Sequence, residues 1–556
     1  MTKILMFILL ISVQAYSQPD ISGKFNFYSN ENGSYKVKTI LIPQINPDIS
    51  GIKNESLDNN YNVGSVQNNT NVRWSFTDPA SIGNNCDISG NGKYNVTDWN
   101  LNNNRISLYG NSNSVPLWEF PSDPNSYINY TSISDTGGVI AVGSYHNIYL
   151  FRNNSGVPFF NFDLTQLEDT GIASALDITS DGSFLVSSVS RNDSSTIFGF
   201  NANSSTPVWK VRLRPTQTTG GGSVQGLKLS GNDSLFIVNT YSEFYVMNTY
   251  TGQIIYNGLI NPGLPSNGTQ SAQGISGDGS VIATINYSGN LRCYQRSGST
   301  YTFLWQHEEP PGQFYNWMTC VDITYDGNYI AAGTLNFISS SSFDGKIKLI
   351  KRSGIGIPDW TFTGAGDEIT ALSFSRSGNI LSASSWGDLN GASEDLYIFK
   401  SFLGNIPVFK LNTAGSLFDC RTSADGRTVT ACGKAVHARQ FGNGGILYNI
   451  DVDTSDTPTG IFNSSASIAD EFRLYQNFPN PFNPVTNISF EIRSAEFTEL
   501  KIFDLLGNEV KSLLKKYLQP GTYTEKFDAS GIPSGIYFYR LTAGNFSETK
   551  KLTLIK

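Results

Sequence analysis

The sequence predicts an all-β protein built from repeated four-stranded units and followed by a second, smaller β domain. An eleven-residue pattern, clearest at residues 322–332, recurs along most of the chain at intervals of 45 to 51 residues. The 556 residues include 53 Gly and 13% aromatic side chains, whereas only 15% are charged, which is typical of a turn-rich protein with more than one core. The residues after Glu471 leave this pattern, which predicts a separate domain there.

Eight copies of the pattern have a first residue that is apolar in seven of them and Thr422 in the last, then a hydroxyl residue, two mostly polar residues and Gly. The hydroxyl residues are Ser89, Ser134, Thr179, Ser230, Ser276, Thr324, Ser375 and Ser423. The fifth position is Gly in seven copies, and Asp233 is the exception. A tight turn between right-twisting strands needs a residue that reaches positive φ without a Cβ clash. Each copy is therefore predicted to form a strand, a tight turn and a second strand.

Each predicted turn is followed by a third short strand, such as 148–151, and by a fourth that often carries Trp, such as 116–120. Four strands in 45 to 51 residues, repeated, are typical of a β-propeller, in which one blade is too small to bury its own faces. We predict an eight-bladed β-propeller over residues 72–452, with seven blades as the alternative. The Trp residues recur at blade spacing, so we expect them to pack in the core or between blades rather than to bind sugars.

The two ends of this region predict a closed ring. The last copy ends after its third strand, 446–450, whereas an unaccompanied strand with the same W-x-F pattern, 72–76, precedes the first copy. We expect this N-terminal strand to complete the last blade, because that pairing removes two sheet edges that would otherwise be free to aggregate.

Residues 1–17 resemble a secretory signal peptide, with Lys3, an apolar core at 4–11 and a small-x-small cleavage site before Gln18. The alternative, a membrane anchor, is disfavoured because the core is too short to span hydrocarbon. We expect no transmembrane segment in the mature chain. Residues 18–71 are rich in Asn and are expected to be a partly ordered extension with strand only near 35–42. Residues 453–470 are expected to be a polar linker.

Charge and cysteine content exclude some classes of protein. The net charge is −8 and no Lys/Arg cluster occurs before the C-terminal region, so nucleic-acid binding is not expected. Five cysteines are present, and Cys420 and Cys432 flank one predicted hairpin turn where they could face each other. The other interpretation is that the cysteines are small buried hydrophobic residues. No Cys/His spacing suggests zinc, so no metal site is predicted.

Two features of the repeats resemble known propeller families. The segments FYVMNTYTGQIIY from Phe244 and IYLFRNNSGVPFF from Ile148 resemble the repeats of the quinoprotein-like propeller superfamily, and the S-x-D-G turns are similar to those of tryptophan-aspartate (WD) repeats. The resemblance implies the fold alone, since propellers host enzymes, scaffolds and lectins alike.

Residues 471–556 open with a proline-rich run, N-F-P-N-P-F-N-P at 477–484, and continue with alternating strands that predict a small Ig-like β-sandwich. The segment closely resembles the type A C-terminal sorting domain of the type IX secretion system of Bacteroidota and relatives. The matching positions include Asn477, Pro479, Asn480, Pro481, Phe482, Asn483, Pro484, Gly507, Gly535 and Tyr537. The resemblance implies recognition by the type IX machinery, export to the cell surface or medium, and commonly removal of this domain.

The innermost strand of each blade lines the channel of a propeller, so one position of each copy should recur around the axis. We call these eight positions the channel ring: Asp87, Ser132, Asp177, Lys228, Gly274, Asp322, Ser373 and Arg421. The charged members form a candidate site for an ion or a small polar ligand: Asp87, Asp177, Lys228, Asp322 and Arg421. The interpretation that we favour is that these side chains pair with one another and with water, which avoids the cost of desolvating channel charges.

No catalytic residue, cofactor or metal is predicted. His146, His307 and His437 have unrelated surroundings, which gives little support to a catalytic triad or a histidine metal site. The motifs of quinone-dependent dehydrogenases are not found. His307, Glu308 and Glu309 are expected to lie in a solvated loop. Three Trp outside the blade register, Trp99, Trp317 and Trp386, are weak carbohydrate-binding candidates.

These observations predict a secreted or surface-bound binding or scaffold module whose partner is an unknown extracellular protein or polysaccharide, bound through the loops of the blades. The alternative is an extracellular enzyme that uses the channel mouth, either a glycan hydrolase or lyase or a divergent quinoprotein.

Overall fold

The computed structural model describes residues 24–31, 34–41, 69–122, 127–167, 171–190, 194–214, 222–260, 273–310, 316–339, 342–455 and most of 472–555, the exceptions being 475, 478–479, 481, 493–495, 506, 519–520 and 545. The expected signal peptide, most of the extension and linker, and Pro479 and Pro481 lie outside these residues. The chain divides into two compact units, Met1–Thr457 and Pro458–Lys556. Within the described ranges, no helix is long and apolar enough to cross a membrane.

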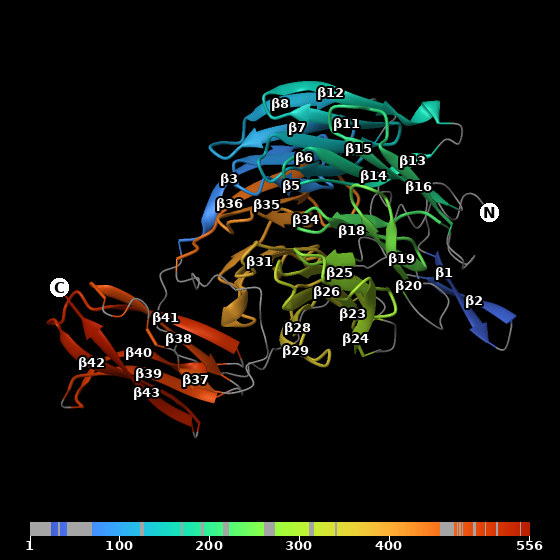
Figure 1. Cartoon of the computed structure of the whole chain (residues 1–556). Coiled ribbons are helices and arrows are strands. Elements are labelled where there is room, and N and C mark those ends of the chain that lie inside the picture. Colours follow the sequence, from blue (N-terminus) through green and yellow to red (C-terminus); the bar gives the residue numbers. More distant parts are fainter. Residues whose placement is uncertain are drawn as a thin grey trace. The chain divides into compact units, whose positions relative to one another are not determined.

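The regular structure in the described part of the first unit is β-strand, as predicted, apart from two short 3₁₀ helices. Between residues 71 and 451 its strands form eight antiparallel sheets, each with a path of four strands that follow one another in space (Figure 1). Two of these sheets carry one additional short strand. A separate hairpin near the N-terminus pairs β1 (Lys24–Glu31) with β2 (Ser34–Leu41), so the extension contains one strand more than the sequence predicted.

Sheets 1 to 4 follow in chain order. Sheet 1 contains β4 (Ser81–Ile82), β5 (Cys86–Ile88), β6 (Tyr94–Leu101), β7 (Arg105–Gly110) and β8 (Pro116–Pro121). Sheet 2 contains β9 (Ile128–Ile133), β10 (Val139–Ser144), β11 (Asn147–Arg152) and β12 (Ser155–Asp163), followed by the 3₁₀ helix η1 (Leu164–Gln166). Sheet 3 contains β13 (Ile172–Ile178), β14 (Phe184–Ser190), β15 (Ser195–Asn201) and β16 (Trp209–Leu213). Sheet 4 contains β17 (Gly226–Leu229), β18 (Leu235–Asn239), β19 (Glu243–Asn248) and β20 (Ile254–Leu259).

Sheets 5 to 8 continue the same order. Sheet 5 contains β21 (Gln273–Ile275), β22 (Val281–Ile285), β23 (Asn290–Ser297) and β24 (Thr300–Glu308). Sheet 6 contains β25 (Trp317–Ile323), β26 (Tyr329–Phe337), β27 (Phe343–Asp344), β28 (Ile347–Lys351) and β29 (Pro358–Phe362). Sheet 7 contains β30 (Ile369–Phe374), β31 (Ile380–Ser385), β32 (Leu396–Lys400) and β33 (Phe409–Leu411), with η2 (Ser401–Leu403) after β32. Sheet 8 contains β34 (Ser416–Thr422), β35 (Thr428–Lys434), β36 (Gly445–Asp451) and β3 (Asn71–Asp78).

The N-terminal strand completes the last sheet, as predicted. β3 pairs antiparallel with β36, with Trp74 opposite Asn449 and Ser75 opposite Tyr448. In each sheet, the strand that precedes the glycine turn is here called the first strand; in sheet 1 this strand is β5. Each first strand contacts the first strand of the next sheet, and β34 of sheet 8 contacts β5 of sheet 1. The succession of sheets therefore returns to its starting point, which is a propeller-like arrangement (Figure 1).

The repeated pattern forms the turn between the first and second strands of every sheet. The fifth position has positive φ in all eight copies, from 61° at Asp233 to 75° at Gly426. The conserved hydroxyl has a role that the sequence did not reveal, because its oxygen accepts a hydrogen bond from the backbone N–H five residues later. These bonds are 3.0 to 3.2 Å long in all eight turns. Each hydroxyl therefore fixes the start of the second strand.

Asp233 shows how the one exception is accommodated. Positive φ costs a residue with a Cβ about 1–2 kcal/mol relative to Gly. The Asp233 carboxylate offsets this cost, since it accepts hydrogen bonds from the backbone N–H and the hydroxyl of Ser180 in the preceding sheet.

The Trp residues of the fourth strands join neighbouring sheets, as predicted. Each indole N–H donates to a backbone carbonyl of the following sheet over 2.8 to 3.2 Å. The pairs are Trp74 with Asn111, Trp118 with Asn153, Trp209 with Thr249, Trp305 with Arg352, and Trp360 with Ser401. The Trp74 bond crosses from sheet 8 to sheet 1, so the closing strand uses the same contact as the others.

All five cysteines are free and buried, in agreement with the interpretation as small hydrophobic residues. Cys420 does not face Cys432, because a register shift places Cys420 opposite Ala431 and Cys432 opposite Asp419. The two thiols therefore point to opposite faces of sheet 8 and pack into different apolar clusters.

The second unit consists of two antiparallel sheets on one apolar core. One sheet contains β37 (Arg473–Leu474), β38 (Val485–Ile492) and β41 (Gly521–Asp528), and the other contains β39 (Glu496–Phe503), β40 (Glu509–Leu518), β42 (Gly535–Ala543) and β43 (Phe546–Leu554). Ile488 and Phe490 of the first sheet share a core with Leu500 and Tyr539 of the second. The strands predicted between 486 and 556 are all present.

A glycine substitution tests how the turns determine the packing of sheets. An added Cβ at Gly327 would lie 2.7 Å from Val281, whereas one at Gly298 would meet nothing within 4 Å. Both residues have positive φ, so both substitutions by Ala carry the same backbone strain of about 1–2 kcal/mol. We expect Gly327→Ala to lower the unfolding temperature more than Gly298→Ala, as measured by Trp fluorescence on heating. Equal shifts would contradict the packing role.

Candidate functional site

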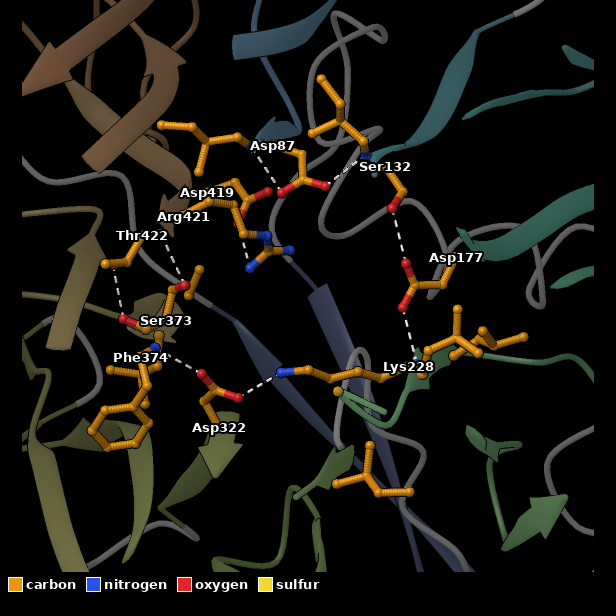
Figure 2. A pocket seen from close by; sticks show the side chains of 18 of the residues that line it. Asp87, Ser132, Asp177, Lys228, Asp322, Ser373, Phe374, Asp419, Arg421 and Thr422 are labelled. Carbon is orange, nitrogen blue, oxygen red and sulfur yellow. Dashed lines mark hydrogen bonds and ion pairs between the residues drawn. The ribbon is translucent and has the colours of Figure 1, made fainter. Parts of the chain in front are cut away.

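A central cavity of about 470 Å³ lies where the first strands of the eight sheets meet. The channel ring residues that carry a functional side chain all line it: Asp87, Ser132, Asp177, Lys228, Asp322, Ser373 and Arg421. Figure 2 shows these side chains around one open space, with Asp419 beside Arg421. The structure therefore brings the predicted ring together.

The ring carboxylates hold adjacent sheets together. Asp87 of sheet 1 accepts hydrogen bonds from the backbone N–H of Ile88 and, across the junction, from Ile133 of sheet 2, each 2.9 Å long. Asp177 of sheet 3 accepts from Leu229 of sheet 4 at 2.9 Å and from the hydroxyl of Ser132 in sheet 2 at 2.8 Å. Both carboxylates are thus committed to backbone and side-chain donors of neighbouring strands.

The same kind of bond continues through sheets 6, 7, 8 and 1. Asp322 accepts from the N–H of Phe374 at 2.8 Å, and the Ser373 hydroxyl oxygen accepts from the N–H of Thr422 at 3.0 Å. Asp419 then accepts from the N–H of Cys86 at 3.2 Å, which joins sheet 8 to sheet 1. Sequence reasoning missed Asp419, which lies two positions before Arg421 on the same strand.

Sheet 5 has no side chain in the ring, and a cation spans its place. Lys228 of sheet 4 reaches Asp322 of sheet 6 in an ion pair of 2.5 Å (Figure 2), whereas Gly274 of sheet 5 has no side chain to contribute. The other cation, Arg421, lies 3.2 Å from Asp419. With the Lys228–Asp322 ion pair, the hydrogen bonds form a closed series that links seven of the eight sheets and bypasses sheet 5.

Burial changes the charge of this cavity. It raises the pKa of Asp87 to about 7 despite the nearby Arg421 cation, and it also raises the pKa of Asp177 and of Asp419. At neutral pH Asp87 is therefore only partly ionised. The ring carries less negative charge than its carboxylates alone suggest, which reduces its attraction for a cation.

Large side chains obstruct the cavity at the end where the glycine turns lie, which we call the turn end. Tyr325 of sheet 6 lies so close to Gly231 and Gly277 that a Cβ at either glycine would come within 2.5 Å of its ring. The Arg376 guanidinium stacks on Tyr325 at 5.3 Å and pairs with Asp135 of sheet 2. The turns of sheets 4 and 5 carry Gly because Tyr325 occupies the space beside them.

The opposite end, which we call the loop face, carries the loops between second and third strands and the connections between sheets. Five half-buried aromatic rings there come from sheets 5, 6 and 7, and we call them the aromatic arc: Tyr287, Trp317, Phe337, Phe343 and Trp386. Ring centroids are 4.7 Å apart between Tyr287 and Trp317, 5.2 Å between Trp317 and Phe337, and 5.5 Å between Phe337 and Phe343.

Arg439 of sheet 8 connects Trp386 with Phe343 in the aromatic arc. Its guanidinium lies 3.8 Å from the centre of the Phe343 ring and 5.3 Å from that of Trp386. Asp367 holds it with two hydrogen bonds of 2.6 and 2.8 Å. The charge of Arg439 is thereby neutralised within the protein, and the guanidinium acts as part of an aromatic surface.

Trp317 and Trp386 are therefore on one surface, but Trp99 is not. Trp99 is fully buried against Phe76 between sheets 8 and 1, so it is excluded as a carbohydrate-binding residue. The expected solvated loop at 307–309 is also wrong, since His307 and Glu308 end strand β24 and Glu309 is buried. Its carboxylate is buried and forms ion pairs of 2.9 Å with Lys346 and 2.7 Å with Lys348. The two lysines flank Ile347, and nothing in the sequence indicates that they pair with Glu309.

No group of three or more His, Cys, Asp or Glu side chains in the described parts of the chain is arranged to hold a metal ion.

Several predicted motif residues of the second unit have structural contacts. The Asn477 backbone N–H donates to the Tyr539 hydroxyl at 2.9 Å, and its side chain donates to Thr486 at 3.0 Å. The Asn480 side-chain oxygen accepts from the N–H of Thr553 at 2.8 Å, and Phe482 is buried in the core. The proline-rich run is thus attached to the last strand of the chain.

Other motif residues occupy turns or the surface. Gly507 has positive φ in the turn before β40, Gly535 begins β42, and the Tyr537 hydroxyl donates to the carbonyl of Pro533 at 2.8 Å. Asn483 is exposed and Pro484 is half-buried. Among the motif positions that the structure describes, Asn483 and Gly507 are exposed.

Comparison with known proteins identifies the class of the C-terminal region. Residues 476–556 match a family model described as a secretion system C-terminal sorting domain. The chain is therefore a cargo of the type IX secretion system, which exports it to the outer cell surface or releases it, and the predicted localisation is confirmed. Comparison with curated proteins gives no match.

A substitution in the channel ring separates a structural role from ligand binding. Asp177→Ala removes the acceptor of the Leu229 and Ser132 bonds, and leaving one buried donor unpaired costs about 1–3 kcal/mol. We expect Asp177→Ala and Asp322→Ala to lower the unfolding temperature while leaving the affinity for an extracellular ligand unchanged in equilibrium binding measurements. A loss of affinity at unchanged stability would instead assign a ligand to the ring.

A second prediction concerns Glu368, next to Asp367. Burial and the neighbouring Asp367 raise the pKa of Glu368 to about 8, from an ordinary value near 4.5. The folded chain thus binds the proton of the Glu368 carboxyl more tightly than the unfolded chain does. The contribution of this proton to the free energy of unfolding is complete below pH 4 and is lost as the pH rises through 8. We expect Glu368→Gln to raise the unfolding temperature at pH 9 and to leave it unchanged at pH 5. Parallel pH profiles for the two proteins would contradict this.

Proposed function

We propose that this chain is an extracellular binding module in which the eight sheets are the blades of an eight-bladed β-propeller over residues 72–452, carried to the cell surface by an Ig-like sorting sandwich at 471–556. The contacts between successive first strands, including β34 with β5, support eight blades. The shared core of the two C-terminal sheets supports the sandwich.

The observation that carries the binding proposal is the aromatic arc on the loop face. Five half-buried rings and one neutralised guanidinium from sheets 5 to 8 form a continuous series of contacts. Exposed apolar side chains extend it in the same loops: Phe441 is 77% exposed, Ile338 65% and Leu389 39%. An apolar surface of this kind on an exported protein is typical of an interaction site rather than of an inert face.

The chemistry of the arc favours a polysaccharide over a protein partner. Sugar rings present C–H groups that stack on aromatic faces, and their hydroxyls need hydrogen-bond acceptors and donors beside those faces. Asp344 directly follows Phe343 in the chain, and Asp388 lies two residues after Trp386. The only cation of the arc, Arg439, is already paired with Asp367. These features fit a neutral glycan better than an acidic one.

In this proposal the channel ring is structural. Its carboxylates already accept backbone N–H groups from neighbouring sheets, and its cations already pair with carboxylates. The cavity therefore supports a ligand role, including that of the alternative enzyme, less well than the loop face does.

Substitutions on the loop face test the proposal. The full-length secreted protein is screened against neutral and acidic polysaccharides and surface proteins, and the strongest ligand is titrated by calorimetry. We expect Trp317→Ala combined with Trp386→Ala to weaken glycan binding at least tenfold, because both stacking platforms are lost, at a cost of about 1 kcal/mol or more for each. Phe441→Ser, on an exposed side chain, should weaken it without affecting folding.

The matched control is Ile355→Ser, since Ile355 is also 77% exposed but lies at the turn end, between β28 and β29. Its affinity should equal that of the unmodified protein. Binding that is restricted to proteins, or an Ile355 variant as weak as the Phe441 variant, would overturn the assignment of a glycan to the arc.

A further inference from the structure

Cys86 and Cys432 meet at the junction where the succession of sheets closes. Cys86 begins β5, the first strand of sheet 1, and Cys432 lies in β35, the second strand of sheet 8. Both side chains are buried in one cluster with Trp74, Trp99 and Leu447. The strands that carry them, β5 and β35, contact each other, and each thiol perturbs the pKa of the other. The Cys86 thiol also donates a hydrogen bond to the carbonyl of Asp419 at 3.7 Å. The sequence did not suggest this pair, because its two members are 346 positions apart in the chain.

The backbone on both sides of this pair is held in place. The N–H of Cys86 donates to the Asp419 carboxylate at 3.2 Å, and the N–H of Gly83 donates to the carbonyl of Gly433, next to Cys432, at 3.2 Å. A Cβ built on Gly83 would lie 3.2 Å from the Cβ of Cys432, so the segment between β4 and β5 approaches Cys432 about as closely as glycine allows. The two thiols are thus fixed side by side rather than brought together by chance motion of loops.

We infer that Cys86 and Cys432 are the site of a disulfide that covalently closes the ring of sheets in the exported protein. The bond forms between the two sulfur atoms, and each loses its proton. The two electrons pass to a disulfide oxidant, such as a periplasmic oxidase or oxidised glutathione, which is reduced to two thiols. Export by the type IX system carries the chain out of the reducing cytoplasm, into compartments where such oxidants act.

The timing of the reaction follows from burial. Desolvation raises the pKa of both thiols, so the reactive thiolate is scarce once the sheets have closed. The bond therefore forms as β5 and β35 come together during folding outside the cytoplasm.

The test uses the full chain recovered from the surface or medium of a cell that exports it. Free thiols are alkylated in guanidinium without reductant, and the peptides are analysed by mass spectrometry. We expect one cross-linked peptide pair containing Cys86 and Cys432, with Cys293, Cys320 and Cys420 alkylated. Alkylation of all five cysteines, or a cross-link between Cys420 and Cys432, would overturn the inference.

Variants provide a second readout that does not depend on the peptide map. A disulfide that encloses so long a loop should raise the unfolding temperature by about 5 °C or more. We expect dithiothreitol to lower the unfolding temperature of the unmodified protein and of Cys293→Ser, but not that of Cys86→Ser or Cys432→Ser. An equal response to dithiothreitol in all four proteins would contradict a bond at this junction.

Discussion

The series of hydrogen bonds between the first strands of the sheets is the constraint on which the structure depends. A single four-stranded sheet cannot bury both faces, so each must be held against two neighbours at a fixed height. Asp87, Asp177 and Asp322 do this with backbone N–H groups of the next sheet, and Lys228 covers the position where Gly274 offers no side chain. The Trp indoles repeat the same function at the outer edge. Each sheet is thus registered at its inner and outer strands.

Much of this could be predicted from the sequence because the repeat is local. Residues within one copy predict the positive φ at the fifth position and the strands around it. The phase of the two ends predicts the pairing of 72–76 with the last sheet. The exchange of Gly for Asp233 was visible, but its reason was not, since Ser180 lies in another sheet. Contacts between copies have no fixed spacing in the chain, and a pattern of residues does not reveal them.

The same limit explains the results at the candidate sites. The channel ring was found because it occupies one position of every copy, whereas Asp419 was missed because no other copy has a carboxylate there. Trp317 and Trp386 were noted only as exceptions to the register, and their connection through Arg439 required the loops of sheets 6, 7 and 8. Glu309 was misjudged for a similar reason, since the lysines that bury it are supplied by β28 and the residue before it.

The pairing of β3 with β36 also gives the molecule a polarity. Asn71 lies opposite Asp451, and the N–H of Val452 donates to the carbonyl of Arg427 in the last glycine turn, so the chain leaves the first unit at the turn end. The loops of the first unit, including those that carry the aromatic arc, emerge at its other pole, away from the strand end at which β36 is left.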